Sequence, residues 1–252
     1  MPKLVGEIER RLLVNYRVDP EVLARLLPAP FRPQLVNGVG VAGICLIRLG
    51  GMRPLGLPGW VGRGSENAAH RIAVEWDDAE GTRTGVYIPR RDSDSLINVL
   101  VGGRLYPGEH HRARFDVAES DTEVHVAYTA QDGSAYVDVR ASVAADLLGS
   151  VVFPDLEDAS RFFERGSIGF SATSSPGRFD GLELRTNAWK VEPAVVDAVQ
   201  SSFFDDQSRF PEGAVYLDSA LIMRRVPVEW RALGPLNADA PATTGTPSTG
   251  GA

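Results

Sequence analysis

Short runs of alternating apolar and polar residues, joined by turn signals, constrain this chain more than any other feature of its sequence. Two segments, 71–88 and 122–143, alternate on both sides of a turn, the first near Gly81 and the second at Asp132-Gly133. A period of two residues is typical of strands with one buried face, and Asp-Gly is a frequent hairpin turn. The sequence therefore predicts a chain dominated by strands, with a last strand at 214–226.

Three helices are expected between these strands. The first begins at Pro20 after the N-cap Asp19, and the second spans 156–165 after the N-cap Asp155. A proline at the first helical position and an Asp at the N-cap are both typical of helix starts. A third helix is predicted to start at Pro193.

The chain of 252 residues is long enough to bury one large core, and two independent domains are not expected. We predict one domain over residues 1–236. The segment 50–67 is crowded with Gly and Pro and predicts a long loop. The segment 237–252 has almost no large apolar residue and is predicted to be a disordered tail.

A formal net charge of −7 argues against nucleic acid or an anionic membrane as the main partner, because both require a concentrated basic face. The first 18 residues include acidic side chains and contain no long apolar stretch, so neither a signal peptide nor a membrane span is expected, and a cytoplasmic location is predicted. Cys45 is the single cysteine and excludes an internal disulfide. The apolar residues around it predict a buried, inert thiol.

Two motifs suggest chemistry that their context does not support. The segment 38–43 matches GxGxxG by letter, but an apolar, strand-like run follows it where a dinucleotide site needs a helix. His110 and His111 are adjacent, and neighbouring residues of a strand point to opposite faces, so they are poorly placed to share one metal ion. No metal and no cofactor are expected.

Several stretches together resemble the DUF2071 (YqjF-like) proteins of the acetoacetate decarboxylase-like superfamily. The resemblance runs from Tyr16 to about Pro227 and implies a mostly β, α+β fold whose antiparallel sheets close into a cone-shaped barrel around a pocket, with a few flanking helices. The stretches that carry it are "YRVDPEVLARLLPAPFRPQLVNGVGVAGICLIRL", "ENAAHRIAV", "GVYIPRRDSDS", "GGRLYPGEHHRARF" and "WKVEP".

The decarboxylases of this superfamily form a Schiff base on a lysine, and this chain has no lysine where the resemblance places it. An ungapped alignment from Gly102 puts His110 at that position, whereas an alignment on Pro107 puts Gly108 there. Neither residue can form an imine. Lys190 is the one internal lysine, and it is either a solvated side chain or a relocated amine.

The resemblance suggests Glu66, His110 and Arg104 as catalytic groups for acid and base work, because histidine exchanges protons near neutral pH. Arg residues can hold a carboxylate or an enolate through two parallel hydrogen bonds. We expect either a lysine-independent enzyme for a small carbonyl or carboxylate compound, acting by proton transfer, dehydration or decarboxylation, or a non-catalytic ligand-binding protein. A homo-oligomer is compatible with both. The residues expected to bind the small molecule are Arg71, Tyr87, Arg90, Tyr106 and Lys190.

Overall fold

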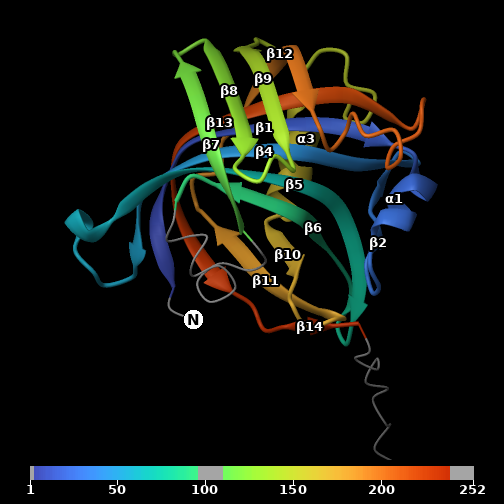
Figure 1. The fold of residues 1–252 in the computed structure, drawn as a ribbon, viewed down its shortest axis with the longest axis horizontal. Helices are drawn as coiled ribbons and strands as arrows, with labels where there is room; N and C mark the ends of the chain where they lie inside the picture. The colour runs from blue at the N-terminus through green and yellow to red at the C-terminus, as the bar shows by residue number, and fades with distance from the viewer. Residues whose placement is uncertain (1–2, 96–109, 239–252) are drawn as a thin grey trace, which may run out of the picture.

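The computed structural model describes residues 3–95 and 110–238, and strands form most of this part of the chain. In Figure 1 the helices labelled α1 and α3 lie beside one extensively curved sheet. The strands are β1 (Leu4–Val18), β2 (Arg32–Pro33), β3 (Leu35–Val36), β4 (Val39–Pro54), β5 (Arg63–Asp78), β6 (Gly81–Ser93), β7 (His110–Glu119), β8 (Glu123–Ala130), β9 (Tyr136–Val143), β10 (Ile168–Ala172), β11 (Arg178–Arg185), β12 (Glu192–Ser201), β13 (Val215–Ala232) and β14 (Leu236–Asn237). The helices are α1 (Pro20–Leu26), the 3-10 turn η1 (Gly59–Val61) and α3 (Leu156–Arg165).

The sheet closes on itself in two rings that share strands. In the first ring, strand pairs connect β1, β4, β5, β6, β10, β11 and β13, and β13 pairs back with β1. In the second ring, β6 continues through β7, β8, β9 and β12 to the same β13. The strands β13, β1, β4, β5 and β6 therefore form a shared wall, with β7, β8, β9 and β12 on one side of it and β10 and β11 on the other (Figure 1).

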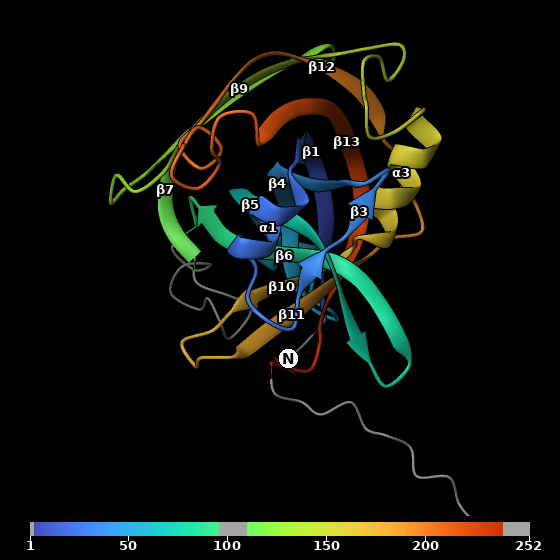
Figure 2. The same ribbon diagram turned by 90° about the vertical axis from the view of Figure 1, so that its right-hand side faces the viewer.

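Alternation along the shared wall supplies two apolar cores. Leu12 and Val14 of β1 belong to a core that also takes residues from β8 and β9. Leu13 belongs to a second core, together with Phe163 of α3 and Leu184 of β11. Because successive side chains of a strand point to opposite faces, one strand contributes to both cores. Figure 2 shows α3 at the side of the molecule opposite β7.

The predicted hairpins are confirmed, and their turns contain the expected residues. β3 and β4 pair across Asn37 (φ 52°) and Gly38 (φ 82°), and β5 and β6 pair across Gly81 (φ 120°). β8 and β9 pair across Gly133, which has a φ of 69°. These positive φ values are accessible to glycine and tolerated by asparagine.

The first two predicted helices are also confirmed, with their caps. Asp19 accepts a hydrogen bond from the Glu21 amide at 2.7 Å at the start of α1. Asp155 accepts one from the Asp158 amide at 2.9 Å at the start of α3. Each side chain satisfies an amide that has no partner within its helix.

Two predictions about secondary structure were wrong. Pro193 begins no helix, because residues from Glu192 to Ser201 form β12, which pairs with β9 and β13. The β-branched valines of this segment suit a strand, and pairing on both sides outweighs the helical start signal. The segment 50–67 is not one long loop, since β4 extends to Pro54, η1 follows, and β5 begins at Arg63.

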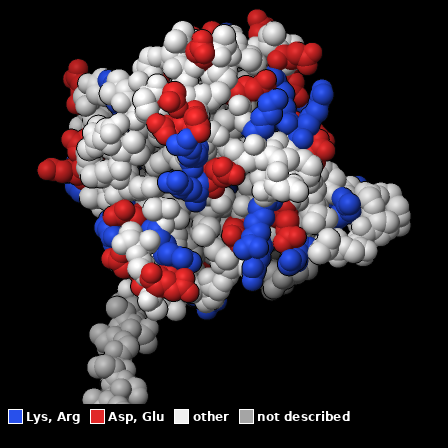
Figure 3. Space-filling view, turned by 180° about the vertical axis from the view of Figure 1, so that it is seen from behind, with Lys and Arg blue, Asp and Glu red and all other residues white. Residues whose placement is uncertain are grey.

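The expected tail is only partly within the structure. Asn237 pairs with Arg178 in β14, and residues 239–252 lie outside the described part of the chain. Neither α-helix in the described ranges has the length and apolar character needed to cross a membrane. On the face shown in Figure 3, basic side chains are interspersed with acidic ones, and no single basic patch dominates it.

Candidate functional site

A cavity of about 100 Å³ lies within the first ring. Side chains from β1, β4, β5, β6, β11 and β13 line it, and the turn after α3 closes one end. Most of its lining is apolar, for example Ile47, Ile88 and Leu184. We call it the arginine cavity, because Arg11, Arg71 and Arg91 all line it.

Arg71 is held in the wall of the cavity from two directions. Its Nη2 donates a hydrogen bond to Asn15 Oδ1 at 2.5 Å, and its guanidinium lies 4.6 Å from the centroid of the Phe163 ring. Gly43 allows this approach, because a Cβ there would lie 2.5 Å from the carbonyl oxygen of Val14 and 3.4 Å from Arg71 Nη2. Arg71 is 5% exposed, and its Nε has no hydrogen-bond partner in the described part of the chain.

The other two arginines have similarly weak partners. Arg91 Nε donates to Ser171 Oγ at 3.1 Å, and Arg11 Nε donates to Cys45 Sγ at 3.3 Å. Among the residues that the structure describes, no carboxylate forms an ion pair with Arg11, Arg71 or Arg91. Among the described residues, Asp92 is the one acid in the lining, and Arg90 donates two hydrogen bonds to it.

Burial of these cations is unfavourable. It lowers the pKa of Arg71 to about 9 and that of Arg91 to about 10, because a buried guanidinium loses its hydration. Both groups remain charged at neutral pH. A cavity with several cations, none of them ion-paired to a carboxylate of the described residues, is suited to an anion of matching size.

His110 is the first residue of β7 and lines the arginine cavity. It pairs in parallel with Arg91 of β6, which places the two side chains on the same face of the sheet. The imidazole is half-buried. The structure thus brings together His110 and Arg71, two of the residues predicted from the sequence.

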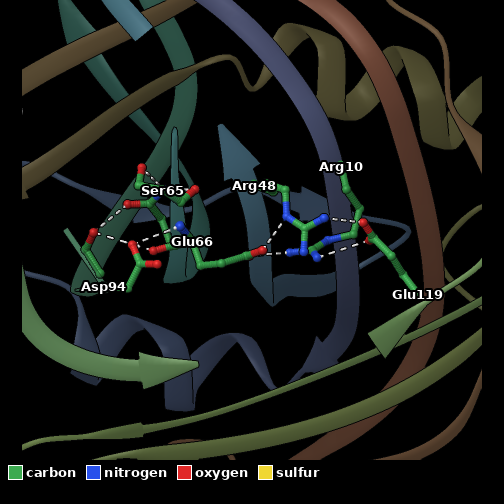
Figure 4. A network of polar contacts seen from close by, with 8 residues as sticks. Arg10, Arg48, Ser65, Glu66, Asp94 and Glu119 are labelled. Atoms are coloured by element: carbon green, nitrogen blue, oxygen red, sulfur yellow. Dashed lines mark hydrogen bonds and ion pairs between the residues drawn. The ribbon is translucent and has the colours of Figure 1, made fainter. Parts of the chain in front are cut away.

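Glu66 lies elsewhere, in a network of charged groups shown in Figure 4. Its two carboxylate oxygens accept hydrogen bonds from Arg10 at 2.6 Å and from Arg48 at 2.5 Å. Both arginines also contact Glu119, and the Glu66 amide donates to Asp94 at 3.0 Å. Glu66 is not among the residues that line the cavity. Alternation along β5 accounts for this, since Asn67 and not Glu66 shares the face of Arg71.

Tyr87 and Arg90 also lie outside the cavity. The Tyr87 ring is buried against Phe31, with centroids 5.5 Å apart, and burial raises the pKa of its hydroxyl. Arg90 donates two hydrogen bonds to Asp92 at 2.8 and 2.9 Å and lines a different hollow beside His111. Both side chains therefore have structural contacts of their own.

The remaining predicted residues either do not line the cavity or lie outside the described residues. Lys190 is exposed and is absent from the cavity lining, which fits the interpretation of a solvated side chain. Arg104 and Tyr106 lie outside the described residues, as does Gly108. Among the described residues, no group of three or more His, Cys, Asp or Glu side chains is placed to hold a metal ion.

Sequence reasoning missed Arg11, Arg91 and Cys45. Each of the three is a charged or reactive residue inside a strand, Arg11 in β1, Cys45 in β4 and Arg91 in β6. Whether these side chains meet in one cavity depends on which strands face one another across the first ring. The parallel pairing of β10 with β6, which helps to close that ring, is not visible in the sequence.

Comparison with solved structures identifies the fold. An acetoacetate decarboxylase from Legionella pneumophila superposes with a TM-score of 0.60 at 10% identity, covering 93% of this chain and 88% of that one. An acetoacetate decarboxylase-like enzyme from Sphingomonas wittichii RW1 gives 0.58 at 14% identity, covering 93% and 92%. The enduracididine biosynthesis enzyme MppR complexed with pyruvate gives 0.57 at 12% identity, covering 94% and 90%. The chain therefore has the predicted acetoacetate decarboxylase-like fold.

A search of curated proteins gave no significant match to this sequence. A family model, described as an uncharacterized conserved protein, matches residues 7–217, which is most of the chain. The protein belongs to the DUF2071 family.

Proposed function

We propose that the arginine cavity binds a small carbonyl compound that carries a carboxylate, and that His110 exchanges a proton with it through an enolate. The observation that carries this proposal is the convergence of Arg11, Arg71 and Arg91 on one cavity, where no carboxylate of the described residues forms an ion pair with any of them. A bound carboxylate offsets the cost of burying these cations.

The size of the cavity limits the ligand. One water molecule needs roughly 10–15 Å³ of such cavity volume. A cavity of about 100 Å³ therefore admits only a compound with few non-hydrogen atoms. Pyruvate is a suitable probe of this class, and the MppR structure with the same fold was solved with pyruvate bound.

The proposed chemistry needs no amine. Lys3 forms an ion pair with Glu229 at 3.0 Å, and Lys190 is exposed away from the cavity. Arg71 or Arg91 can hold the carboxylate through two parallel hydrogen bonds, and a second guanidinium can stabilise the enolate oxygen. His110 lines the same cavity and can remove or return the proton on the neighbouring carbon.

Exchange of the pyruvate methyl protons for deuterium in D2O, followed by proton NMR, tests this proposal. The wild-type protein should accelerate the exchange, whereas His110→Gln and Arg71→Gln should lose most of the acceleration. Arg114→Gln is the control, because Arg114 is exposed on the same strand as His110 and lines no part of the cavity. Binding of pyruvate without exchange would favour a ligand-binding protein, and neither binding nor exchange would contradict the proposal.

A further inference from the structure

Cys45 lies inside the arginine cavity and is the single cysteine of the chain. It belongs to β4 and is 7% exposed. Its sulfur accepts a hydrogen bond from Arg11 Nε at 3.3 Å. The thiolate is the reactive form of cysteine, and a guanidinium that donates to the sulfur stabilises that form.

A second observation indicates that the space beside the sulfur is suited to binding an anion. Arg71 lines the cavity and is 5% exposed, and no described residue forms a hydrogen bond with its Nε. Burial lowers the pKa of both Arg71 and Arg91, and Cys45 is among the groups close enough to each guanidinium to act on that pKa. The sulfur therefore lies within electrostatic reach of the two cations.

We infer that Cys45 is the nucleophile of the cavity, and that its sulfur adds to the β-carbon of an α,β-unsaturated carboxylate held by Arg71 and Arg91. This inference rests on the proposed function, since the same arginines bind the carboxylate. It assigns a covalent role to a side chain that the sequence alone suggests is inert.

The step is balanced without a further reactant. The thiol gives its proton to water and becomes the thiolate. The sulfur forms a bond to the β-carbon, and the electron pair of the double bond moves to the α-carbon and the carboxylate oxygens. Arg71 and Arg91 stabilise that charge, and water then returns a proton to the α-carbon. The net change is addition of S–H across the double bond, and the reverse step is an elimination.

Acrylate and acrylamide form a matched pair of probes, because they differ in charge and hardly in size. Free thiols react faster with acrylamide, since the negative carboxylate makes acrylate a poorer acceptor. The native protein should show the opposite order, with acrylate labelling at least tenfold faster than acrylamide in intact mass spectrometry. The protein unfolded in guanidinium chloride should return to the order of a free thiol.

Three variants complete the test. Cys45→Ser should not be labelled by either probe. Arg71→Gln should remove the preference for acrylate, whereas the exposed Arg114→Gln should keep it. A native protein that prefers acrylamide, or does not react with acrylate, while it binds pyruvate would overturn the role of Cys45 and leave the proposed function standing. If the wild-type protein does not bind pyruvate, both the proposed function and the role of Cys45 are contradicted.

Discussion

The guanidinium of Arg71 lies over the ring of Phe163, 4.6 Å from its centroid, and this contact joins the wall of the first ring to helix α3. Phe163 is 4% exposed and belongs to the core that also contains Leu13 and Leu184. A cation above an aromatic face is attracted by the ring, most strongly where water is excluded. The position of a charge in the cavity thus depends on the packing of a helix outside the sheet.

Replacement of Phe163 by Leu should lower the free energy of unfolding by about 1–2 kcal/mol, which is the size of a desolvated cation–π contact. The affinity for pyruvate should fall several-fold, because Arg71 loses one of its two supports. Calorimetric titration of Phe163→Leu and of Phe162→Leu checks this, since Phe162 is a neighbouring helix residue without the contact to Arg71. Equal affinity in Phe163→Leu and the wild type would show that the ring does not position the guanidinium.

The Glu66→Gln substitution should reduce the free energy of unfolding by about 3 kcal/mol, because it leaves the buried Arg10 without one of its two carboxylates. Arg10 is 1% exposed and cannot regain hydration without local unfolding. Urea unfolding of this variant should be compared with Glu157→Gln, which breaks an exposed helical pair with Arg161 and should cost less than about 0.5 kcal/mol. A similar small loss in both variants would contradict a structural role for Glu66.

Stability should fall in acid because of His70. This side chain is 0% exposed and stacks on Phe203, and burial, with smaller contributions from Arg90 and Arg209, lowers the pKa of its imidazole to about 3. An unfolded histidine titrates near 6.5, so between about pH 6.5 and 3 the unfolded chain binds the extra proton. The lowered pKa therefore contributes stability that is present above about pH 6.5 and is lost as the pH falls towards 3.

The measurement is the free energy of unfolding of the wild type and of His70→Gln at several values between pH 6 and pH 4. The wild type should lose up to about 1.4 kcal/mol per pH unit more than the variant does. Parallel curves for the two proteins would show that His70 does not carry this dependence.

Treatment with pyruvate and borohydride should leave the mass of the protein unchanged. Borohydride traps an imine between a carbonyl compound and a lysine, and neither Lys3 nor Lys190 lines the arginine cavity. Intact mass spectrometry gives the answer. A stoichiometric adduct that maps to Lys190 would restore the Schiff-base mechanism.

Local signals in the sequence predicted those elements whose causes are local. The caps Asp19 and Asp155 and the turn residues Gly81 and Gly133 act within a few residues of themselves, and the helices and hairpins they predict are present. The segment at Pro193 failed because its structure is decided by pairing with β9, about 50 residues away in the chain.

The candidate site could be predicted only in part for the same reason. Arg71 and His110 were identified through the family resemblance, and both line the cavity. Glu66 was expected beside them, but its partners Arg10 and Arg48 come from β1 and β4, and only the folded sheet brings them to it. The convergence of arginines on one cavity depends on closure of the first ring through β11 and β13.

The central claim is that the arginine cavity binds a carboxylate, and calorimetric titration with pyruvate and with its neutral amide, pyruvamide, tests it most directly. The two compounds have nearly the same shape, so a difference in affinity reports the charge. We predict that the wild type binds pyruvate at least tenfold more tightly than pyruvamide, and that Arg71→Gln and Arg91→Gln each lose most of this preference, while Arg114→Gln keeps it. Equal affinity for the two compounds, or a preference for pyruvate that survives both cavity substitutions, would contradict the account.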